Sequence, residues 1–140
     1  MAEPANVEHM SVPTYTLNDG TTLPAIGFGT YPMRGEDGVT AIVSALEGGY
    51  RLLDTAVNYE NETEVGEALR RSGLPRDEVL VASKIPGRHH AYDDAIASVR
   101  GSLERLGVER TDRVIELGRA LSREVVAGGA FPPDTFAVRR

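Results

Sequence analysis

The pattern of apolar residues changes repeatedly between two forms along this chain. Mainly aromatic and apolar runs at 50–53 and 79–83 predict short buried strands. Elsewhere apolar residues recur three and four positions apart, which predicts amphipathic helices that each end at a glycine or proline. The three helical stripes are Val39, Ile42, Val43 and Leu46, then Val65, Ala68 and Leu69, then Ile96, Val99, Leu103 and Leu106. Asn61 and Glu64 stand where a capping box would open the second helix.

Short extended segments precede the first helix. Residues 15–17 and 22–24 flank an Asp-Gly turn and predict a β-hairpin, with Pro24 at a sheet edge. Residues 25–31 predict a short strand whose glycines permit close approach of backbone or ligand, although a plain glycine-containing turn would have the same sequence. Residues 1–14, with two prolines and few apolar residues, predict a flexible arm.

The elements therefore follow one another as a hairpin and then strand, helix, strand, helix, strand, helix. Such alternation predicts an α/β fold with a parallel sheet and right-handed crossovers. After Gly107 a fourth strand is due, but the residues from Thr111 onward have helical spacing, so we expect a helix there and then an irregular tail. The two faces of this helix would carry Asp112, Glu116, Arg119 and Arg123, and Val114, Leu117, Leu121 and Val125.

Composition limits the class of protein. The chain has 140 residues, 41% of them hydrophobic and 26% charged, as a soluble globular protein does. Its net charge of -6 argues against nucleic-acid and anionic-membrane partners, so we expect a small-molecule ligand. No cysteine is present, and neither a signal peptide nor a membrane-spanning apolar run is recognisable. We expect a cytoplasmic protein.

Polar residues stand at the ends of the two predicted inner strands. Asp54 ends the first strand, Tyr59 follows in the next loop, and Lys84 ends the second strand. Carboxyl ends of adjacent parallel strands meet at one rim, where α/β proteins bind ligands, so these side chains should converge. Asp54 and Lys84 should lie within salt-bridge reach. A simple rim salt bridge beside a loop aromatic would have the same sequence.

The chemistry of such a group suits proton donation. A tyrosine hydroxyl is a weak acid, with a reference pKa of about 10, and a nearby cation favours its ionised form. Lys84 could be that cation for Tyr59, and Asp54 could hold the ammonium in place. His9, His89 and His90 lack the spacing of metal ligands, and the glutamates at 60, 62 and 64 suit a helix start, so we expect no metal site.

Several segments together resemble the aldo-keto reductase family over about Tyr15 to Asp112. The matching segments are Leu17–Gly20, Leu23–Tyr31, Gly49–Ala56, Asn58–Glu62, Val81–Lys84 and Ser102–Gly107, in that order. The resemblance implies a (β/α)8 TIM barrel that binds NADPH and reduces aldehydes and ketones by hydride transfer. It implies that Tyr59 is the proton donor, Lys84 the cation that makes this phenol more acidic, and Asp54 the partner of Lys84.

The resemblance also implies a cofactor site. Gly29, Thr30 and Tyr31 match the family segment at the nicotinamide end of NADPH, and Asp54 lies near the same end. The substrate would be a small-molecule carbonyl compound.

The carboxyl-terminal part departs from the family pattern. In the family, the third helix is followed by a strand that ends in His-Trp-Pro, and the histidine orients the substrate carbonyl. This chain has no tryptophan and no histidine after His90. A full barrel takes about 250 residues. We therefore expect a partial barrel at 15–112, a divergent helix and tail at 113–140, and a truncated or internally deleted member without turnover of its own.

The alternative is a non-catalytic remnant or βα interaction module that pairs with another chain. A partial barrel leaves two sheet edges open, which favours self-association.

Overall fold

We describe the fold from a computed structural model, in residues 12–17, 20–89, 91–111 and 113–116. An antiparallel hairpin of β1 (Thr14–Thr16) and β2 (Thr22–Pro24) comes first. The main sheet comprises β3 (Phe28–Gly29), β4 (Leu52–Asp54), β5 (Leu80–Ile85) and β6 (Arg113–Glu116). Three helices connect these strands: α1 (Gly35–Glu47), α2 (Glu62–Ser72) and α3 (Tyr92–Leu106). Single 3-10 turns lie at η1 (Val57–Tyr59), η2 (Arg76–Glu78) and η3 (Gly87–His89).

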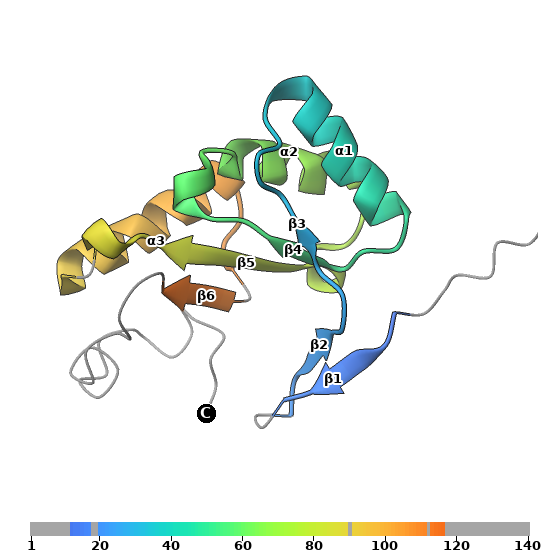
Figure 1. Cartoon of the computed structure of the whole chain (residues 1–140), viewed down its shortest axis with the longest axis horizontal. Helices are drawn as coiled ribbons and strands as arrows, with labels where there is room; N and C mark the ends of the chain where they lie inside the picture. Colours follow the sequence, from blue (N-terminus) through green and yellow to red (C-terminus); the bar gives the residue numbers. More distant parts are fainter. Residues whose placement is uncertain (1–11, 18–19, 90, 112, 117–140) are drawn as a thin grey trace, which may run out of the picture.

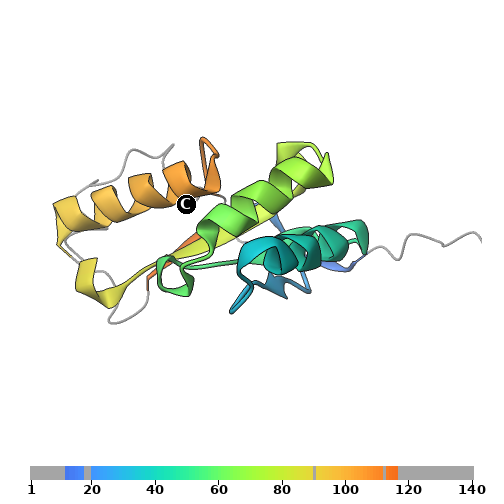
Figure 2. The same ribbon diagram turned by 90° about the horizontal axis from the view of Figure 1, so that it is seen from above.

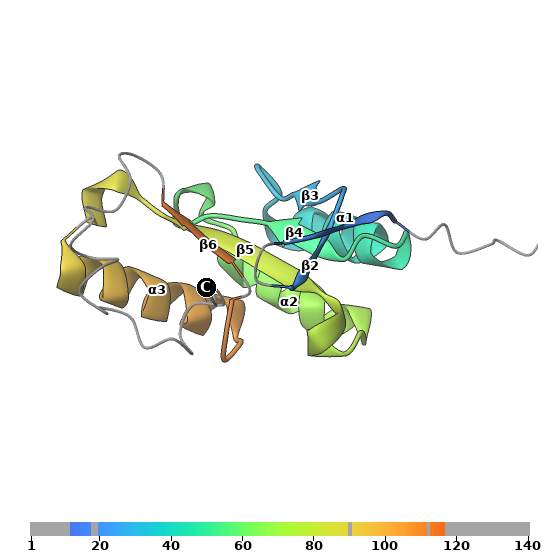
Figure 3. The ribbon, with the colours of Figure 1, turned by 90° about the horizontal axis from the view of Figure 1, so that it is seen from below.

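The main sheet is parallel, with its strands in the order β3-β4-β5-β6. All three helices lie on one face of it, side by side in the order α1, α2, α3 (Figures 1 and 2). From the opposite side the strands are in front of the helices (Figure 3). Within the described residues the sheet does not close on itself. The predicted α/β fold, a partial (β/α)8 barrel behind an N-terminal hairpin, is therefore confirmed.

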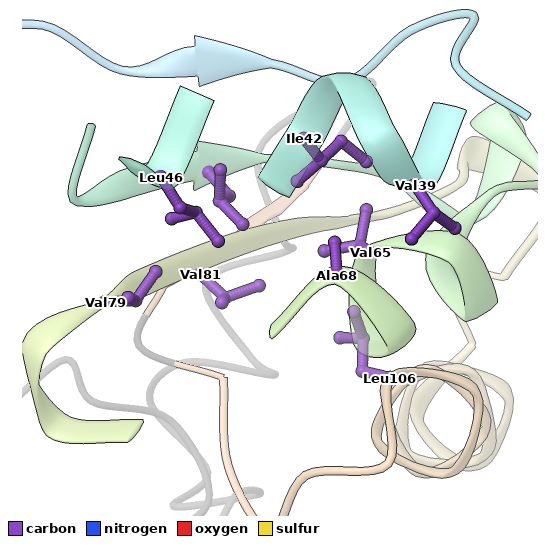
Figure 4. Packing of buried hydrophobic residues seen from close by; sticks show 9 residues of the cluster. Val39, Ile42, Leu46, Val65, Ala68, Val79, Val81 and Leu106 are labelled. Atoms are coloured by element: carbon purple, nitrogen blue, oxygen red, sulfur yellow. The ribbon is translucent and has the colours of Figure 1, made fainter. Parts of the chain in front are cut away.

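The core lies between the sheet and helices α1 and α2. Ile42 and Leu46 from α1, Val65 from α2 and Leu53 and Val81 from the strands are all fully buried (Figure 4). These are the stripes and strand runs predicted from the sequence. Because Leu53 and Val81 face the helices, alternate strand residues face the other side of the sheet.

The predicted helix from Thr111 is wrong at its start. Residues 113–116 form strand β6, which pairs in parallel with β5 through the register Lys84↔Ile115. The free edge of β5 offers backbone donors and acceptors to a new strand, and β-branched Val114 and Ile115 suit an extended conformation. Pairing with a distant strand thus overrides a local helical spacing. The remainder of that predicted helix and the tail lie outside the described residues, and the division of the chain at residues 14 and 112 stays a prediction.

Helices α2 and α3 approach closely at a glycine. A Cβ atom placed on Gly66 would lie 2.2 Å from the Leu106 backbone oxygen, far closer than atoms pack. We predict that Gly66→Ala pushes the two helices apart and lowers the free energy of unfolding by about 1–3 kcal/mol. Native-state amide hydrogen exchange of α2 and α3 measures this change.

The matched control is Gly101→Ala in α3. There the new Cβ would meet only side-chain atoms of Arg105, the nearest being Nη1 at 2.9 Å, so no backbone atom has to move. Alanine also favours a helix interior over glycine by about 1 kcal/mol, so this variant should exchange no faster than the parent chain. Equal exchange in the Gly66 and Gly101 variants would contradict the close contact.

Candidate active site

The parallel register brings the predicted catalytic residues to one rim. Asp54 ends β4 and pairs in register with Ala82 of β5. Lys84 lies two residues beyond Ala82 in β5. It is therefore on the same face of the sheet as Asp54 and nearer the carboxyl end of the strands. Tyr59 ends η1, the turn that follows β4. The rim therefore carries all three residues, as predicted.

The Lys84 ammonium binds the other two side chains directly. Its Nζ atom lies 2.7 Å from both carboxylate oxygens of Asp54 and 2.9 Å from the Tyr59 hydroxyl, and it also donates to the Thr55 carbonyl oxygen at 3.1 Å. The Lys84 side chain is only 11% exposed, whereas that of Asp54 is 36% exposed. The predicted contact between Asp54 and Lys84 is confirmed. A half-buried ammonium with this set of acceptors holds its position firmly.

The backbone around Tyr59 is also fixed. Glu60, the next residue, has a φ of 53°, which is unusual for a residue other than glycine and reverses the chain at this point. Arg34 donates to the Tyr59 carbonyl oxygen at 3.1 Å. On the other side, the Tyr31 and Tyr59 rings lie 5.3 Å apart between centroids. The Tyr59 hydroxyl is thereby directed at Lys84.

The predicted cofactor residues lie beside this group. Gly29 ends β3 and pairs in register with Asp54. Thr30 is fully buried, and both its backbone N–H and its hydroxyl donate to the Asp54 carbonyl oxygen, at 3.0 and 3.1 Å. Tyr31 is 63% exposed. The three residues therefore form a wall next to Asp54, with a small, open position at Gly29.

Asn61 has a different role from the predicted one. It stands at the start of α2, but its side chain makes no capping bond, and Glu64 does not return to it. The buried Asn61 amide instead donates to the carbonyl oxygens of Thr30 and Met33, at 2.7 and 3.0 Å, and accepts from the Thr55 hydroxyl at 3.0 Å. The Asn61 side chain is thus fully used by long-range partners, which leaves it unavailable as a cap.

Glu64 contacts α1 instead. Its carboxylate accepts the backbone N–H of Gly35 at 3.0 Å, and this hydrogen bond is the main cause of a lowered pKa for Glu64. The bond joins the first turns of α1 and α2. The two helices that carry the loops of the site are therefore joined by Glu64 as well as by their apolar stripes.

Sequence reasoning missed a buried carboxylate, Glu62, whose side chain is 1% exposed. It accepts the Ser83 hydroxyl at 2.6 Å and pairs with the Arg105 guanidinium at 2.7–2.8 Å. The network joins α2 and α3 to the residue before Lys84. A glutamate at a helix start, inside the polar run of residues 60–64, gave no sign of burial in the sequence.

Other kinds of site find no support in the described part of the chain. There, no three histidine, aspartate or glutamate residues are grouped as metal ligands. His89 lies on η3, and His9 and His90 are outside the described residues. Among the helices that are described, none combines the length and apolar character needed to cross a membrane. A cytoplasmic location stays a prediction.

The chain that carries Asp54, Tyr59 and Lys84, here called the rim group, matches a known family. The model of the aldo/keto reductase family matches residues 25–117, which include β3 to β6 and every residue of the rim group. This chain belongs to the aldo/keto reductase family. The resemblance noted in the sequence is thereby confirmed.

Individual relatives agree with this membership. The chain is 58% identical over 102 residues to 2,5-diketo-D-gluconic acid reductase B of a Corynebacterium species, a match that covers 73% of this chain and 37% of that protein. An aldo-keto reductase from a deep-sea metagenome library has a TM-score of 0.79 at 32% identity, covering 88% of this chain and 47% of that one. A Bombyx mori aldo-keto reductase solved in complex with NADP has a TM-score of 0.68 at 32% identity, covering 74% and 37%.

The chain thus spans about 37% of the length of this Corynebacterium relative. Membership of the family therefore does not by itself give this chain the activity of its full-length relatives.

Removal of the ammonium tests how far the rim depends on it. Lys84→Met keeps the length of the side chain but leaves the Asp54 carboxylate and the Thr55 carbonyl without their cation. We predict a loss of about 1–3 kcal/mol in the free energy of unfolding, because partly buried acceptors lose their donor. Amide exchange of β4 and β5 should show the loss.

The control is Arg88→Met, which also removes a cation from this end of the sheet. Arg88 is exposed and bonds to Asn58 of η1, so its loss should change stability by less than about 0.5 kcal/mol. An equal effect of both substitutions would mean that the position of Lys84 between Asp54 and Tyr59 has no special energetic importance.

Proposed function

We propose that the rim group is the proton-donating part of a carbonyl-reduction site, with Tyr59 as the acid and NADPH as the cofactor. The observation that carries this proposal is the bridge formed by Lys84 Nζ between the Asp54 carboxylate and the Tyr59 hydroxyl, at 2.7 and 2.9 Å. An isolated rim salt bridge would not require a tyrosine hydroxyl aimed at the ammonium. The substrate class is a small aldehyde or ketone.

Tyr59 has the contacts of a proton donor. As the carbonyl carbon is reduced, its oxygen becomes an alkoxide and takes the proton of the Tyr59 hydroxyl, whose O–H bond breaks. The phenolate that remains lies 2.9 Å from the Lys84 ammonium, and the opposite charge stabilises it. Solvent then returns a proton to Tyr59.

Asp54 and Thr55 position Lys84 for this task. An ammonium has three donors, and here its acceptors are the Asp54 carboxylate, the Thr55 carbonyl oxygen and the Tyr59 hydroxyl. These three acceptors use all three donors of the Lys84 ammonium. Such preorganisation lowers the cost of charge formation, because the surroundings need not rearrange when the phenolate appears.

The residues at the end of β3 fit a nicotinamide cofactor. A Cβ placed on Gly29 meets no other heavy atom within 4 Å, so there is open space beside Asp54 for a flat ring. The wall of Gly29, Thr30 and Tyr31, together with Asp54, would hold that end of NADPH. The cofactor, when bound, supplies the hydride that adds to the carbonyl carbon.

Filling this space tests the cofactor assignment. We predict that NADPH produces a saturable change in nicotinamide fluorescence with the parent chain and none with Gly29→Leu. Because a side chain at residue 29 would meet open space, the leucine variant should keep the amide exchange pattern of the parent. Absence of saturation with the parent chain, or equal binding by the leucine variant, would contradict the assignment.

Turnover is a separate question from binding. Holding the substrate in line can account for about 7–11 kcal/mol of a barrier, and the family's His-Trp-Pro segment, which would do this, is missing from the sequence. We therefore predict no measurable NADPH-dependent reduction of 4-nitrobenzaldehyde by the purified chain. Turnover that disappears in Tyr59→Phe would overturn this prediction and would assign the acid to Tyr59.

A non-catalytic interaction module is the second candidate. The open edges of the sheet favour it, because the described strands leave β3 and β6 without an outer neighbour. Saturable NADPH binding would count against a purely structural role. An absence of binding together with a defined partner would support it.

A further inference from the structure

The main sheet has two open edges and one helix-covered face. Its four described strands have β3 at one edge and β6 at the other, with all helices on the same side (Figures 1 and 3). The opposite face carries Leu52 and Leu80, which pair in register and are half-buried, together with the rim group above them. In a barrel this face would be the interior. Within the described residues both edges therefore lack an outer neighbour and could pair with parallel strands of another molecule.

The number of strands indicates which molecule fits. A (β/α)8 barrel closes with eight parallel strands, and the described sheet has four, which is half of them. A two-fold rotation about the barrel axis keeps all strands parallel and brings β6 of each copy beside β3 of the other. We propose that two copies of this chain associate in this way as an eight-stranded barrel with two identical β6–β3 seams.

Barrel geometry fixes the register of these seams. In a barrel of shear eight, a path that runs perpendicular to the strands around the whole barrel returns to its first strand displaced by about eight residues. Because the strands coil in a right-handed sense, this displacement is toward the amino terminus. Half of the barrel, from β3 of one copy to β3 of the other, therefore gives a displacement of about four residues. The observed register runs from Gly29 through Asp54 and Ala82 to Arg113. Arg113 therefore lies opposite Ala25 of the partner subunit, and Val114 lies opposite Ile26 of the partner subunit.

The segment that this register selects is exposed in the single chain. Residues 25–27 precede β3 without belonging to either sheet, and all three are exposed. Ile26 is 53% exposed, which places it among the most exposed large apolar residues described. The Ala25 N–H already donates to the Pro13 carbonyl oxygen at 2.7 Å, so pairing with β6 would add hydrogen bonds at residues 26 and 27 and would cover Ile26. The same shift of four residues thus brings the outer edge of β6 to an exposed segment that belongs to neither sheet.

The arrangement also affects the rim group. Because the two-fold axis runs along the barrel, both copies would place Asp54, Tyr59 and Lys84 at the same mouth. Leu52 and Leu80 of each copy would face those of the other and lose their contact with water. The dimer would therefore provide each rim group with the opposing wall that a single sheet lacks.

Molecular mass is the first test. Sedimentation of the unmodified chain should give twice 15.1 kDa at micromolar concentration. Ile26→Lys places a charge in the seam and should yield a monomer, whereas Thr40→Lys, on the exposed side of α1, should leave the dimer intact. A monomer at every concentration, or open-ended polymers, would overturn the proposal.

Cross-linking tests the register, and the absence of cysteine from the sequence gives a clean background. Chains with Ile26→Cys alone and chains with Val114→Cys alone should form a disulfide with each other under mild oxidation, but not with their own kind. Within one chain the two positions are on opposite edges, about 14 Å apart across the strands and about 13 Å along them, which is too far for a disulfide.

Each cross-linking outcome decides between arrangements. A covalent Val114→Cys homodimer would mean that two β6 edges pair antiparallel, and a covalent Ile26→Cys homodimer would mean that two hairpin sides meet. Either result would overturn the two-chain barrel. A cross-link only in the mixed sample, together with dimeric mass, would establish it.

Discussion

The structure depends on one ammonium group held between two strand ends. Lys84 binds Asp54 across the β4–β5 pair and Tyr59 at the end of η1, and each of these contacts needs the parallel register in which Asp54 pairs with Ala82. A slip of one residue would turn Lys84 toward the helices, where an unpaired ammonium would be costly. The site and the register of the sheet therefore stabilise each other. The candidate chemistry is a consequence of how the strands pair.

Buried polar side chains extend this constraint to the loops. Asn61 joins the loops after β3 and β4, and Glu62 joins α2, α3 and β5. Both are adjacent residues at the start of α2, so a single helix end fixes the wall that carries Thr30 and the strand that carries Lys84. Such networks are worth their desolvation cost only when every member has a partner, as these do. They hold the backbone on both sides of Asp54, Tyr59 and Lys84 without contacting these three side chains.

The sequence allowed some of these features to be predicted and not others. Asp54 and Lys84 could be predicted because strand ends and parallel pairing follow from short apolar runs, which are local signals. Strand β6 could not, since the spacing of residues 112–125 contains no information about the free edge of β5. Asn61 was misassigned for a similar reason: its partner Thr30 is 31 residues away, and a capping rule considers only neighbours. Local patterns thus predict elements well and predict long-range polar contacts poorly.

The most direct test of the account is an NMR measurement on the chain without cofactor. The Lys84 Nζ atom lies 4.6 Å from the centre of the Tyr59 ring, so the ε-methylene protons of Lys84 should show nuclear Overhauser effects to the ring protons of Tyr59. These effects should weaken in Asp54→Leu, which removes the carboxylate that holds the ammonium. If Lys84 instead shows effects to side chains of α2, it lies on the helix-covered face, and both the register and the proposed chemistry are contradicted.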